Sequence, residues 1–310
     1  MGMPESPSPN RPLAWSRVRS TAQDAFSEFF GVFIFLLFSL ASIAQVVLSN
    51  GQKGTYTSIV LGWGVGITLG AYVAGKSGAH LNPGVTLSMC VYRRLPWSKF
   101  PVYAVAQTAG AFAAAAVVYG NYIKAIDAYE GGPGIRTVPG FSTNATAGIF
   151  ATYPADVVAG SKTAQFFSEF IPSSILMFMI FALTDEGNIA AGKLTPLGLG
   201  LTFVGITACF GWETAFALNF ARDFGPRLLT AAVGYGSEVW TADGHYFWVP
   251  MIAPFLGCLF GGFLYDVFVY EGDSPINTPW MGLKRLVRPG RGREDPEPGL
   301  LRLPSRRQDS

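Results

Sequence analysis

Two asparagines, Asn82 and Asn219, stand at the heads of two short apolar segments, residues 83–91 and 220–233. Asparagine is a favoured N-cap, and a helix N-terminus presents unpaired N–H donors with about half a positive charge. Both segments are too short to cross a bilayer, which takes about 20 helical residues. If the two ends meet inside a membrane, they repel cations and protons while the amides donate to a neutral oxygen. This chemistry predicts a pore for neutral hydroxylic solutes.

Two glutamates occupy matching positions in the chain. The tetrapeptide Phe-Ser-Glu-Phe places Glu28 at the start of one apolar stretch and Glu169 near the start of another. An ionisable group inside a membrane costs a few kcal/mol and needs a partner. We expect both carboxylates to accept hydrogen bonds from the non-helical backbone that leads into the short segments. The alternative is a pair of interfacial glutamates at helix starts.

Arg222 follows Asn219 by three residues and falls in the first turn of the second short segment. The helix dipole disfavours a cation there, so an arginine at this position suggests a functional role. At a pore constriction, Arg222 offers fixed N–H donors and a charge that repels cations. The alternative is an arginine that extends to the outer surface. His80 is expected to be a packing histidine, and no metal site is expected because no ligand pattern accompanies it.

The elements that position these residues are membrane-spanning helices. Half of the 310 residues are hydrophobic and 14% are charged, whereas soluble domains carry about 25% charged residues. The composition therefore predicts an all-α membrane protein. Six stretches are long enough to span a bilayer: residues 29–48, 58–75, 101–122, 164–183, 197–212 and 247–270. An enzyme is disfavoured because no nucleophile, base or metal set is assembled, and no cofactor is expected.

The sequence contains an internal repeat. The Phe-Ser-Glu-Phe tetrapeptide recurs, as does a Leu-Asn pair after the second and fifth stretches. Each copy has three spans, so the second copy must enter the membrane with the opposite orientation. The predicted fold is therefore six transmembrane helices plus two re-entrant half-helices in an inverted repeat. We expect a channel domain over residues 25–271, with repeats at about 25–125 and 164–271 joined by an extracellular loop, 126–163.

Basic residues are distributed unevenly across the predicted membrane. Sixteen of the 22 Lys and Arg residues fall on the side of both termini, and four fall on the other. The positive-inside rule then places both termini in the cytoplasm. The outer loop contains Asn144-Ala145-Thr146, a possible glycosylation site at Asn144. The tails, residues 1–24 and 272–310, are expected to be cytoplasmic, and the second, rich in Pro, Gly and Arg, to be disordered or in contact with lipid.

Two segments carry a family resemblance. Residues 77–86, Ser-Gly-Ala-His-Leu-Asn-Pro-Gly-Val-Thr, and residues 217–227, Ala-Leu-Asn-Phe-Ala-Arg-Asp-Phe-Gly-Pro-Arg, resemble the two signatures of the major intrinsic protein, or aquaporin, family. The aspartate at position 223, directly after Arg222, resembles the pattern of the aquaglyceroporin subfamily. The resemblance is to its fungal type. Thr207 falls where glycerol channels have a small residue and water channels commonly a histidine.

The resemblance implies a passive channel for glycerol and water, and possible further solutes are small polyols or urea. It also implies a homotetramer in a lipid bilayer, most simply the plasma membrane, with no cofactor, metal or nucleic-acid partner. The implied selectivity filter is Trp63, Thr207, Phe216 and Arg222. The implied carbonyl ladder is Gly78, Ala79, His80, Phe216, Ala217 and Leu218. The signature neighbours are Pro83, Gly84, Phe220, Ala221 and Asp223.

Two positions depart from the family pattern. Gly84 replaces the usual alanine, and Phe220 replaces the proline that normally opens the second half-helix. Proline suits that position because its φ is pre-set and its missing N–H was unpaired anyway. We expect the pore to persist with altered width or gating.

Three other functions stay open at this point. One is a channel mainly for urea or metalloid hydroxides, and another is a channel for water only. The third, from a different class, is a non-conducting membrane junction or adhesion protein, which the large ring of Phe220 near the pore makes conceivable.

Overall fold

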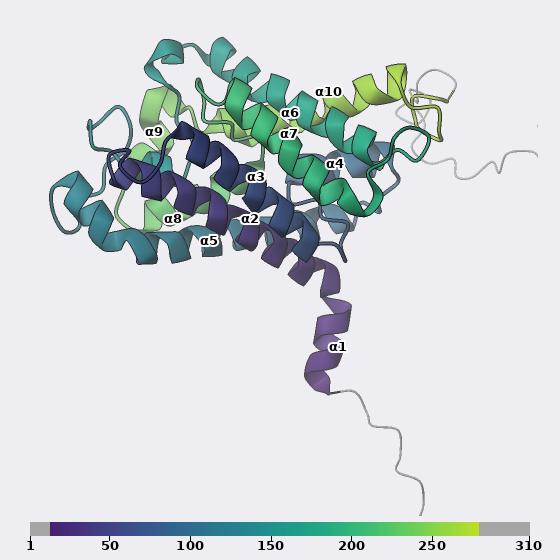
Figure 1. Ribbon diagram of the computed structural model, residues 1–310, viewed down its shortest axis with the longest axis horizontal. Helices are drawn as coiled ribbons and strands as arrows, with labels where there is room; N and C mark the ends of the chain where they lie inside the picture. Colours follow the sequence, from purple (N-terminus) through teal and green to yellow (C-terminus); the bar gives the residue numbers. More distant parts are fainter. Residues whose placement is uncertain (1–12, 279–310) are drawn as a thin grey trace, which may run out of the picture.

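A computed structural model describes residues 13–278, which form a bundle of helices with no β-strand in that range (Figure 1). Six helical segments are long and apolar enough to cross a membrane. They are α2 (Gln23–Leu48), α3 (Tyr56–Val73), α5 (Lys99–Glu130), α6 (Lys162–Thr184), α7 (Thr195–Phe210) with the preceding 3₁₀ turn η3 (Gly192–Leu194), and α10 (Trp248–Phe268). The predicted six spans are confirmed.

Shorter helices complete the fold. The two predicted half-helices are α4 (Pro83–Tyr92) and α8 (Phe220–Ala232). Two 3₁₀ turns, η1 (Ala147–Ile149) and η2 (Asp156–Val158), lie in the long loop between α5 and α6, and α9 (Glu238–His245) connects α8 to α10. A first helix, α1 (Ala14–Thr21), was not predicted.

The helices extend past the predicted spans. Helix α5 covers Lys99–Glu130, although its apolar stretch was placed at 101–122, and α2 begins at Gln23 rather than near residue 29. The reason is that hydropathy measures only the part of a helix that matches the bilayer thickness. Beyond it, α5 continues through Lys124 and Asp127, which are polar but compatible with a helix.

The packing repeats between the two halves of the chain. Helix α2 packs against α3 and α5, and α6 packs in the same way against α7 and α10. The half-helices cross between the repeats: α4, from the first, packs on α10, and α8, from the second, packs on α5. In Figure 1, α8 and α4 lie toward opposite ends of the bundle. Each repeat therefore completes the other.

Glycines allow the helices to approach closely. A Cβ on Gly66 of α3 would lie 2.6 Å from the Phe35 carbonyl oxygen and 2.9 Å from Ser39 Oγ on α2. Gly110 of α5 and Gly257 of α10 face backbone carbonyls of α2 and α6 in corresponding ways. Such small residues are typical of membrane helix interfaces, where association depends on packing rather than on the hydrophobic effect.

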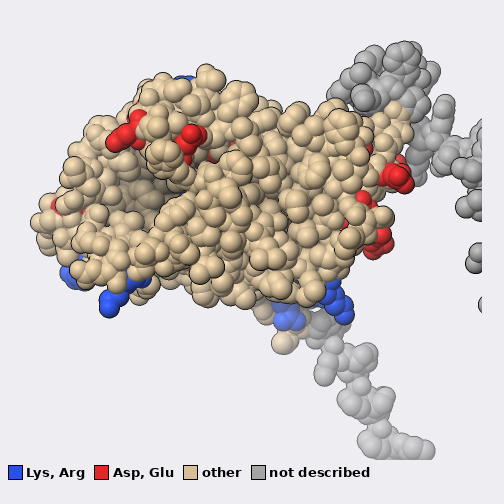
Figure 2. Space-filling model, turned by 45° about the horizontal axis from the view of Figure 1, so that its top comes forward, with Lys and Arg blue, Asp and Glu red and all other residues tan. Residues whose placement is uncertain are grey.

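Charged side chains gather toward the two ends of the molecule, with a broad uncharged belt between them in the view of Figure 2. Helix α1 and the segment after α10 lie at the same end (Figure 1). Residues 272–278, which were expected to be disordered, pack on the bundle: the Ser274 side chain is buried and donates to Asp266. The rest of the predicted tails, residues 1–12 and 279–310, lies outside the described residues.

We predict that Gly66→Ala lowers stability by about 1–3 kcal/mol, the usual range for an overpacked core, because the new methyl group would overlap Phe35 and Ser39. The measurement is the thermal unfolding midpoint of the purified protein in detergent. Gly120→Ala is the matched control, since a Cβ there meets no atom within 4 Å. Equal midpoints for both variants would contradict the prediction.

Candidate pore and selectivity filter

The N-termini of the two half-helices are capped by the two asparagines. Asn82 Oδ1 accepts the Gly84 N–H at 2.8 Å. Asn219 Oδ1 accepts the N–H groups of Ala221 at 2.9 Å and Arg222 at 3.3 Å. Both asparagines have the extended backbone of an N-cap. The side-chain oxygen of each is thus occupied, which points the amide nitrogen away from its own helix.

The same asparagines join the two half-helices. Asn82 Nδ2 donates to the Leu218 carbonyl at 2.8 Å, and Asn219 Nδ2 donates to the Leu81 carbonyl at 2.7 Å. These bonds are reciprocal, so each helix end is held by the loop that precedes the other. An amide nitrogen carries two hydrogens. One hydrogen of each asparagine is therefore left for another acceptor.

The loops before the half-helices adopt an unusual backbone. Positive φ angles occur at Ala79 (56°) and Leu81 (56°) in the first loop, and at Phe216 (42°) and Leu218 (55°) in the second. Residues with a Cβ pay roughly 1–2 kcal/mol in this region. Both loops are therefore strained and need support from the surrounding protein.

Glu28 supplies that support to the first loop. Its carboxylate, fully buried in α2, accepts the backbone N–H groups of His80 at 3.0 Å and Leu81 at 2.7 Å. It also accepts Ser77 Oγ–H at 2.5 Å and Gln107 Nε2–H at 2.7 Å. Four donors surround one carboxylate, so the charge is compensated without a cation.

Glu169 holds the second loop from α6 in the equivalent way. It accepts the backbone N–H groups of Ala217 and Leu218, each at 2.9 Å, and is fully buried. The two glutamates thus occupy matching places on α2 and α6, beside the two strained loops.

The four predicted filter residues come from four elements. Trp63 of α3 and Phe216 of the second loop meet edge to face, with ring centroids 4.9 Å apart. The guanidinium carbon of Arg222 lies 4.6 Å from the Trp63 ring centroid. Thr207 of α7 is fully buried, and Tyr56 Oη donates to its backbone carbonyl at 2.7 Å. Two aromatic rings and a cation therefore share one small region.

Arg222 is only partly satisfied by protein. Its Nη1 donates to the Phe150 carbonyl at 3.0 Å, which ties it to the outer loop. Its Nε has no protein partner within residues 13–278, and the same holds for Trp63 Nε1 and Thr207 Oγ1. Buried polar atoms are almost always hydrogen-bonded, so the unpaired nitrogens of the adjacent Arg222 and Trp63 side chains indicate a site for a polar guest.

Asp223 pairs with Arg227 rather than with the neighbouring Arg222. Its carboxylate accepts Arg227 Nε–H at 2.7 Å and the Thr152 backbone N–H at 2.8 Å. Arg227 in turn donates to the carbonyls of Thr152 and Val239, each at 2.6 Å. This buried network fixes half-helix α8 to the outer loop, and Arg227 and Thr152 had no predicted role.

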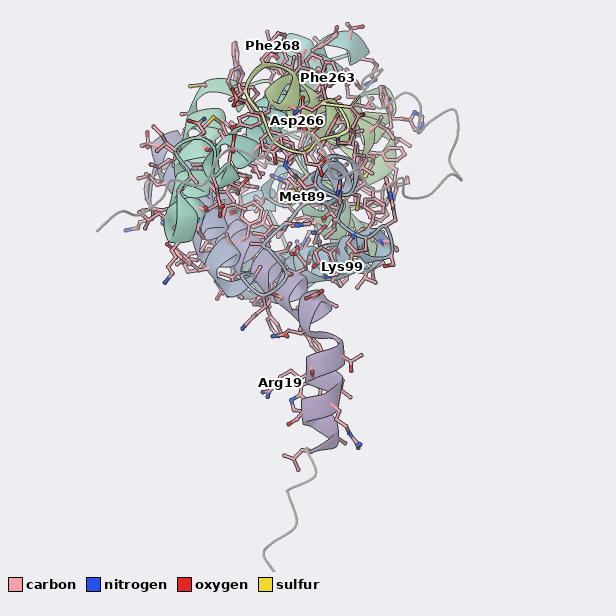
Figure 3. The ribbon with its side chains drawn as sticks, turned by 90° about the vertical axis from the view of Figure 1, so that its right-hand side faces the viewer. Arg19, Met89, Lys99, Phe263, Asp266 and Phe268 are labelled. Atoms are coloured by element: carbon pink, nitrogen blue, oxygen red, sulfur yellow. The ribbon has the colours of Figure 1, made fainter. Side chains whose placement is uncertain are left out.

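His80 packs as expected. Its ring lies 5.1 Å from the Tyr103 ring, centroid to centroid, and its Nδ1 is 3.1 Å from Thr86 Oγ1. Together with Gly78 and Ala79 it lines a cavity of about 610 Å³ at the end of the bundle that carries α1. Figure 3 looks onto this end and shows Met89 near its middle. Met89 also lines that cavity, so the first loop opens to this side through it.

Gly84 and Phe220, the two positions that depart from the family pattern, are both in contact with α10. A Cβ on Gly84 would lie 3.1 Å from Cys258 Sγ and 3.2 Å from the Pro254 carbonyl, so there is little room for alanine. The Phe220 ring packs at a tilt against the rings of Phe224 and Phe255, with centroids 5.0 and 5.9 Å away. Asn219 keeps its bond to the opposite loop beside this ring.

The predicted sequon lies in the loop between α5 and α6. Asn144 is exposed, whereas Thr146 is fully buried. The Thr146 hydroxyl donates to Glu130 and lies 2.6 Å from Tyr235 Oη. Thr146 therefore has a structural role that is independent of glycosylation.

A charged contact joins α9 to the start of α6. Asp243 accepts Lys162 Nζ–H at 2.7 Å, Gln165 Nε2–H at 2.5 Å and the Gly160 N–H at 2.8 Å. Burial alone would raise the pKa of the Asp243 carboxyl, but these three donors outweigh burial and hold that pKa below its usual range. The stability that this contact gives is present above the ordinary aspartate pKa and is lost as the pH falls through the lowered value.

Six spans around two opposed half-helices, joined by reciprocal asparagine bonds, define a membrane channel of the aquaporin fold. Residues 15–265 match the family model described as major intrinsic protein, and the chain belongs to this family.

Similar proteins are found among fungi and in a solved structure. The chain is 65% identical over 288 residues to a protein named probable aquaglyceroporin-2 of Gibberella zeae, covering 93% of this chain and 84% of the relative. It is 61% identical over 280 residues to aquaglyceroporin-9 of Botryotinia fuckeliana, covering 90% and 61%. The X-ray structure of the aquaglyceroporin from Plasmodium falciparum aligns with a TM-score of 0.69 at 32% identity, covering 80% of this chain and 96% of that one.

We predict that Asp223→Asn destabilises the protein by about 3–5 kcal/mol, because it leaves the Arg227 charge buried and uncompensated. Thermal unfolding in detergent measures the loss. Asp273→Asn breaks an exposed ion pair with Arg94 and is the control, expected to change stability by at most about 1 kcal/mol. The double variant Asp223→Asn/Arg227→Gln should recover part of the loss. A small effect for Asp223→Asn alone would refute this view of the network.

We predict that Phe220→Pro still conducts but is less stable, by about 1–2 kcal/mol, since a half-buried ring is lost rather than a core one. Asn219 has the extended φ of −157° and ψ of 117° that a following proline permits, as Asn82 has before Pro83. Flux in vesicles and thermal unfolding are the two measurements, with Phe220→Ala as the comparison. A folded Phe220→Pro protein that does not conduct would contradict the prediction.

Proposed function

We propose that this protein is a passive channel for glycerol and water that excludes ions and protons. One observation carries the proposal: the apolar corner of Trp63 and Phe216 faces the guanidinium of Arg222, with buried polar atoms left unpaired beside them. Glycerol has a carbon side and a hydroxyl side, and this arrangement offers a surface to each. The names of the relatives support the same function, since all three reported above are aquaglyceroporins.

The passage of a solute follows from the donors and acceptors along its path. In the filter, the carbon atoms lie against the two aromatic rings while hydroxyl oxygens accept from Arg222. The backbone carbonyls of residues 78–80 and 216–218 then take the place of water as acceptors. At the centre, the free amide hydrogens of Asn82 and Asn219 donate to the solute oxygen. A neutral molecule exchanges hydration for these contacts at little net cost.

Ions meet a different balance of energies. Two half-helix N-termini face the centre, each with about half a positive charge, and Arg222 adds a full one at the filter. A cation would lose its hydration where the field is repulsive. A proton moving along a water chain meets the same field. Exclusion of both is therefore part of the proposal.

We also propose the setting in which the channel works. It is a multi-pass protein of the plasma membrane with both termini in the cytoplasm, as the sixteen-to-four distribution of basic residues favours. The assembly is a homotetramer, as the family resemblance implies. Asn144 is exposed on the outer side and is available to carry a glycan.

Light scattering of vesicles that contain the purified full chain tests the function. The vesicles are mixed with a glycerol, a urea or an impermeant osmolyte gradient, and empty vesicles are the baseline. Reswelling in glycerol, with no dissipation of an imposed proton gradient, is the expected result. Water flux without solute entry would show a water channel instead. Preferential entry of urea would show a urea channel. Permeability equal to empty vesicles would favour a non-conducting junction protein.

Thr207→Val tests the filter itself. The Thr207 hydroxyl has no protein partner in the described part of the chain, so we expect unchanged stability but a roughly 2- to 10-fold loss of glycerol flux, the usual worth of one hydrogen bond. Thr202→Val is the matched control in the same helix, because its hydroxyl donates to the Gly198 carbonyl. Equal glycerol flux through Thr207→Val and wild type would exclude this hydroxyl from the filter.

A further inference from the structure

Helix α1 has one apolar side and basic flanks. At 100° per residue, Ala14, Trp15 and Val18 fall on one side of the helix, and Arg17 and Arg19 fall on either edge of it. No Asp or Glu occurs in Ala14–Thr21. Trp15 is 60% exposed and Val18 is 50% exposed. Eight residues with this pattern are typical of a helix that lies in a membrane interface.

The direction of α1 fits that setting. In Figure 1 it runs across the long direction of the bundle, and in Figure 3, which looks along that direction, it extends outward from the rim with Arg19 far from the spans. It therefore lies parallel to the membrane plane, at the end of the bundle where the segment after α10 also lies. No residue of α1 is buried by the described part of the protein.

An apolar groove begins where α1 joins the bundle. It has a volume of about 620 Å³, lies between the adjoining ends of α2 and α5, and is lined by apolar residues that include Phe26, Phe30, Val102 and Val105. Val105 is 70% exposed and Phe30 is 50% exposed. The Trp15 ring lies 5.8 Å from the Phe26 ring, centroid to centroid, so the apolar side of α1 continues into the groove.

The charge at this corner is positive. Asp24, at the start of α2, accepts Lys99 Nζ–H at 2.7 Å and is neutralised by it. Figure 3 shows Lys99 close to the root of α1. Arg17 and Arg19 form no ion pair within residues 13–278. A bound molecule with an anionic end and an apolar chain would satisfy both parts of the corner.

We propose that an anionic phospholipid of the adjacent leaflet binds at this corner, with its headgroup at Arg17 and Arg19 and an acyl chain in the groove between α2 and α5. A lipid is favoured over a protein partner because an eight-residue helix offers far less than the roughly 800 Å² that a stable protein interface buries on each side. The groove also opens on the outer faces of two membrane-spanning helices, where lipid is the neighbouring solvent.

Quenching of Trp15 fluorescence by brominated lipids tests the proposal. The full chain is placed in phosphatidylcholine vesicles that contain a minor fraction of brominated phosphatidylserine or, separately, of brominated phosphatidylcholine. The Trp15 signal is the difference between wild type and Trp15→Phe. We expect phosphatidylserine to quench it at a lower fraction than phosphatidylcholine, and Arg17→Gln and Arg19→Gln each to weaken that preference about fivefold.

Two control variants separate the corner from general surface charge. Lys76→Gln removes an exposed basic residue outside α1 and should keep the preference. Val102→Phe fills the groove and should lower the number of phosphatidylserine molecules retained per chain in native mass spectrometry. Glycerol flux at the wild-type rate shows that each variant is folded.

Three results would overturn the proposal. Equal quenching by the two brominated lipids would show no preference for the anionic headgroup. A loss for Lys76→Gln as large as for the arginine variants would reduce the effect to net charge. Trp15 unquenched by either lipid would place α1 in water or against a protein.

Discussion

The membrane interior offers no water to satisfy an open backbone, and the fold depends on how that constraint is met. Two non-helical loops must enter the bilayer core, because only non-helical carbonyls can face a passing solute. Their N–H groups then need acceptors, and Glu28 and Glu169 supply them from the neighbouring long helices. The same bonds hold residues such as Leu81 and Leu218 at positive φ. Removal of either carboxylate would leave both the strain and the unpaired donors.

Electrostatics and packing are combined in the half-helices. Their N-termini meet because each asparagine binds the carbonyl of the opposite loop, although two positive helix ends repel each other. Packing of α4 on α10 and of α8 on α5 overcomes that repulsion. Arg222 adds to the repulsion, and its side chain is held by the Phe150 carbonyl and by the nearby Trp63 ring. Asp223 binds Arg227 rather than Arg222. The positive field at the centre is thus maintained by contacts outside the pore.

The six spans predicted from the sequence are confirmed, and the roles of the candidate site residues stay predictions. The spans follow from hydropathy, and the half-helices from short apolar segments headed by Asn82 and Asn219, which are local signals. The supports were harder to foresee: Phe150 acts through a backbone carbonyl, which any residue type provides. Gln107 and Thr152 contact the site from distant parts of the chain. The Asp223–Arg227 spacing was visible, but its role depends on what the outer loop places beside it.

The exchange of half-helices between the repeats has a consequence for biosynthesis. The loop before α4 is complete once about a quarter of the chain has been made, but its Leu81 carbonyl receives its partner only when Asn219 is in place. Meanwhile α4 has no α10 to pack on. The first repeat must therefore wait in the membrane with an unfinished, polar interior. We therefore expect insertion in two stages, in which the second half closes a cavity that the first half has left open.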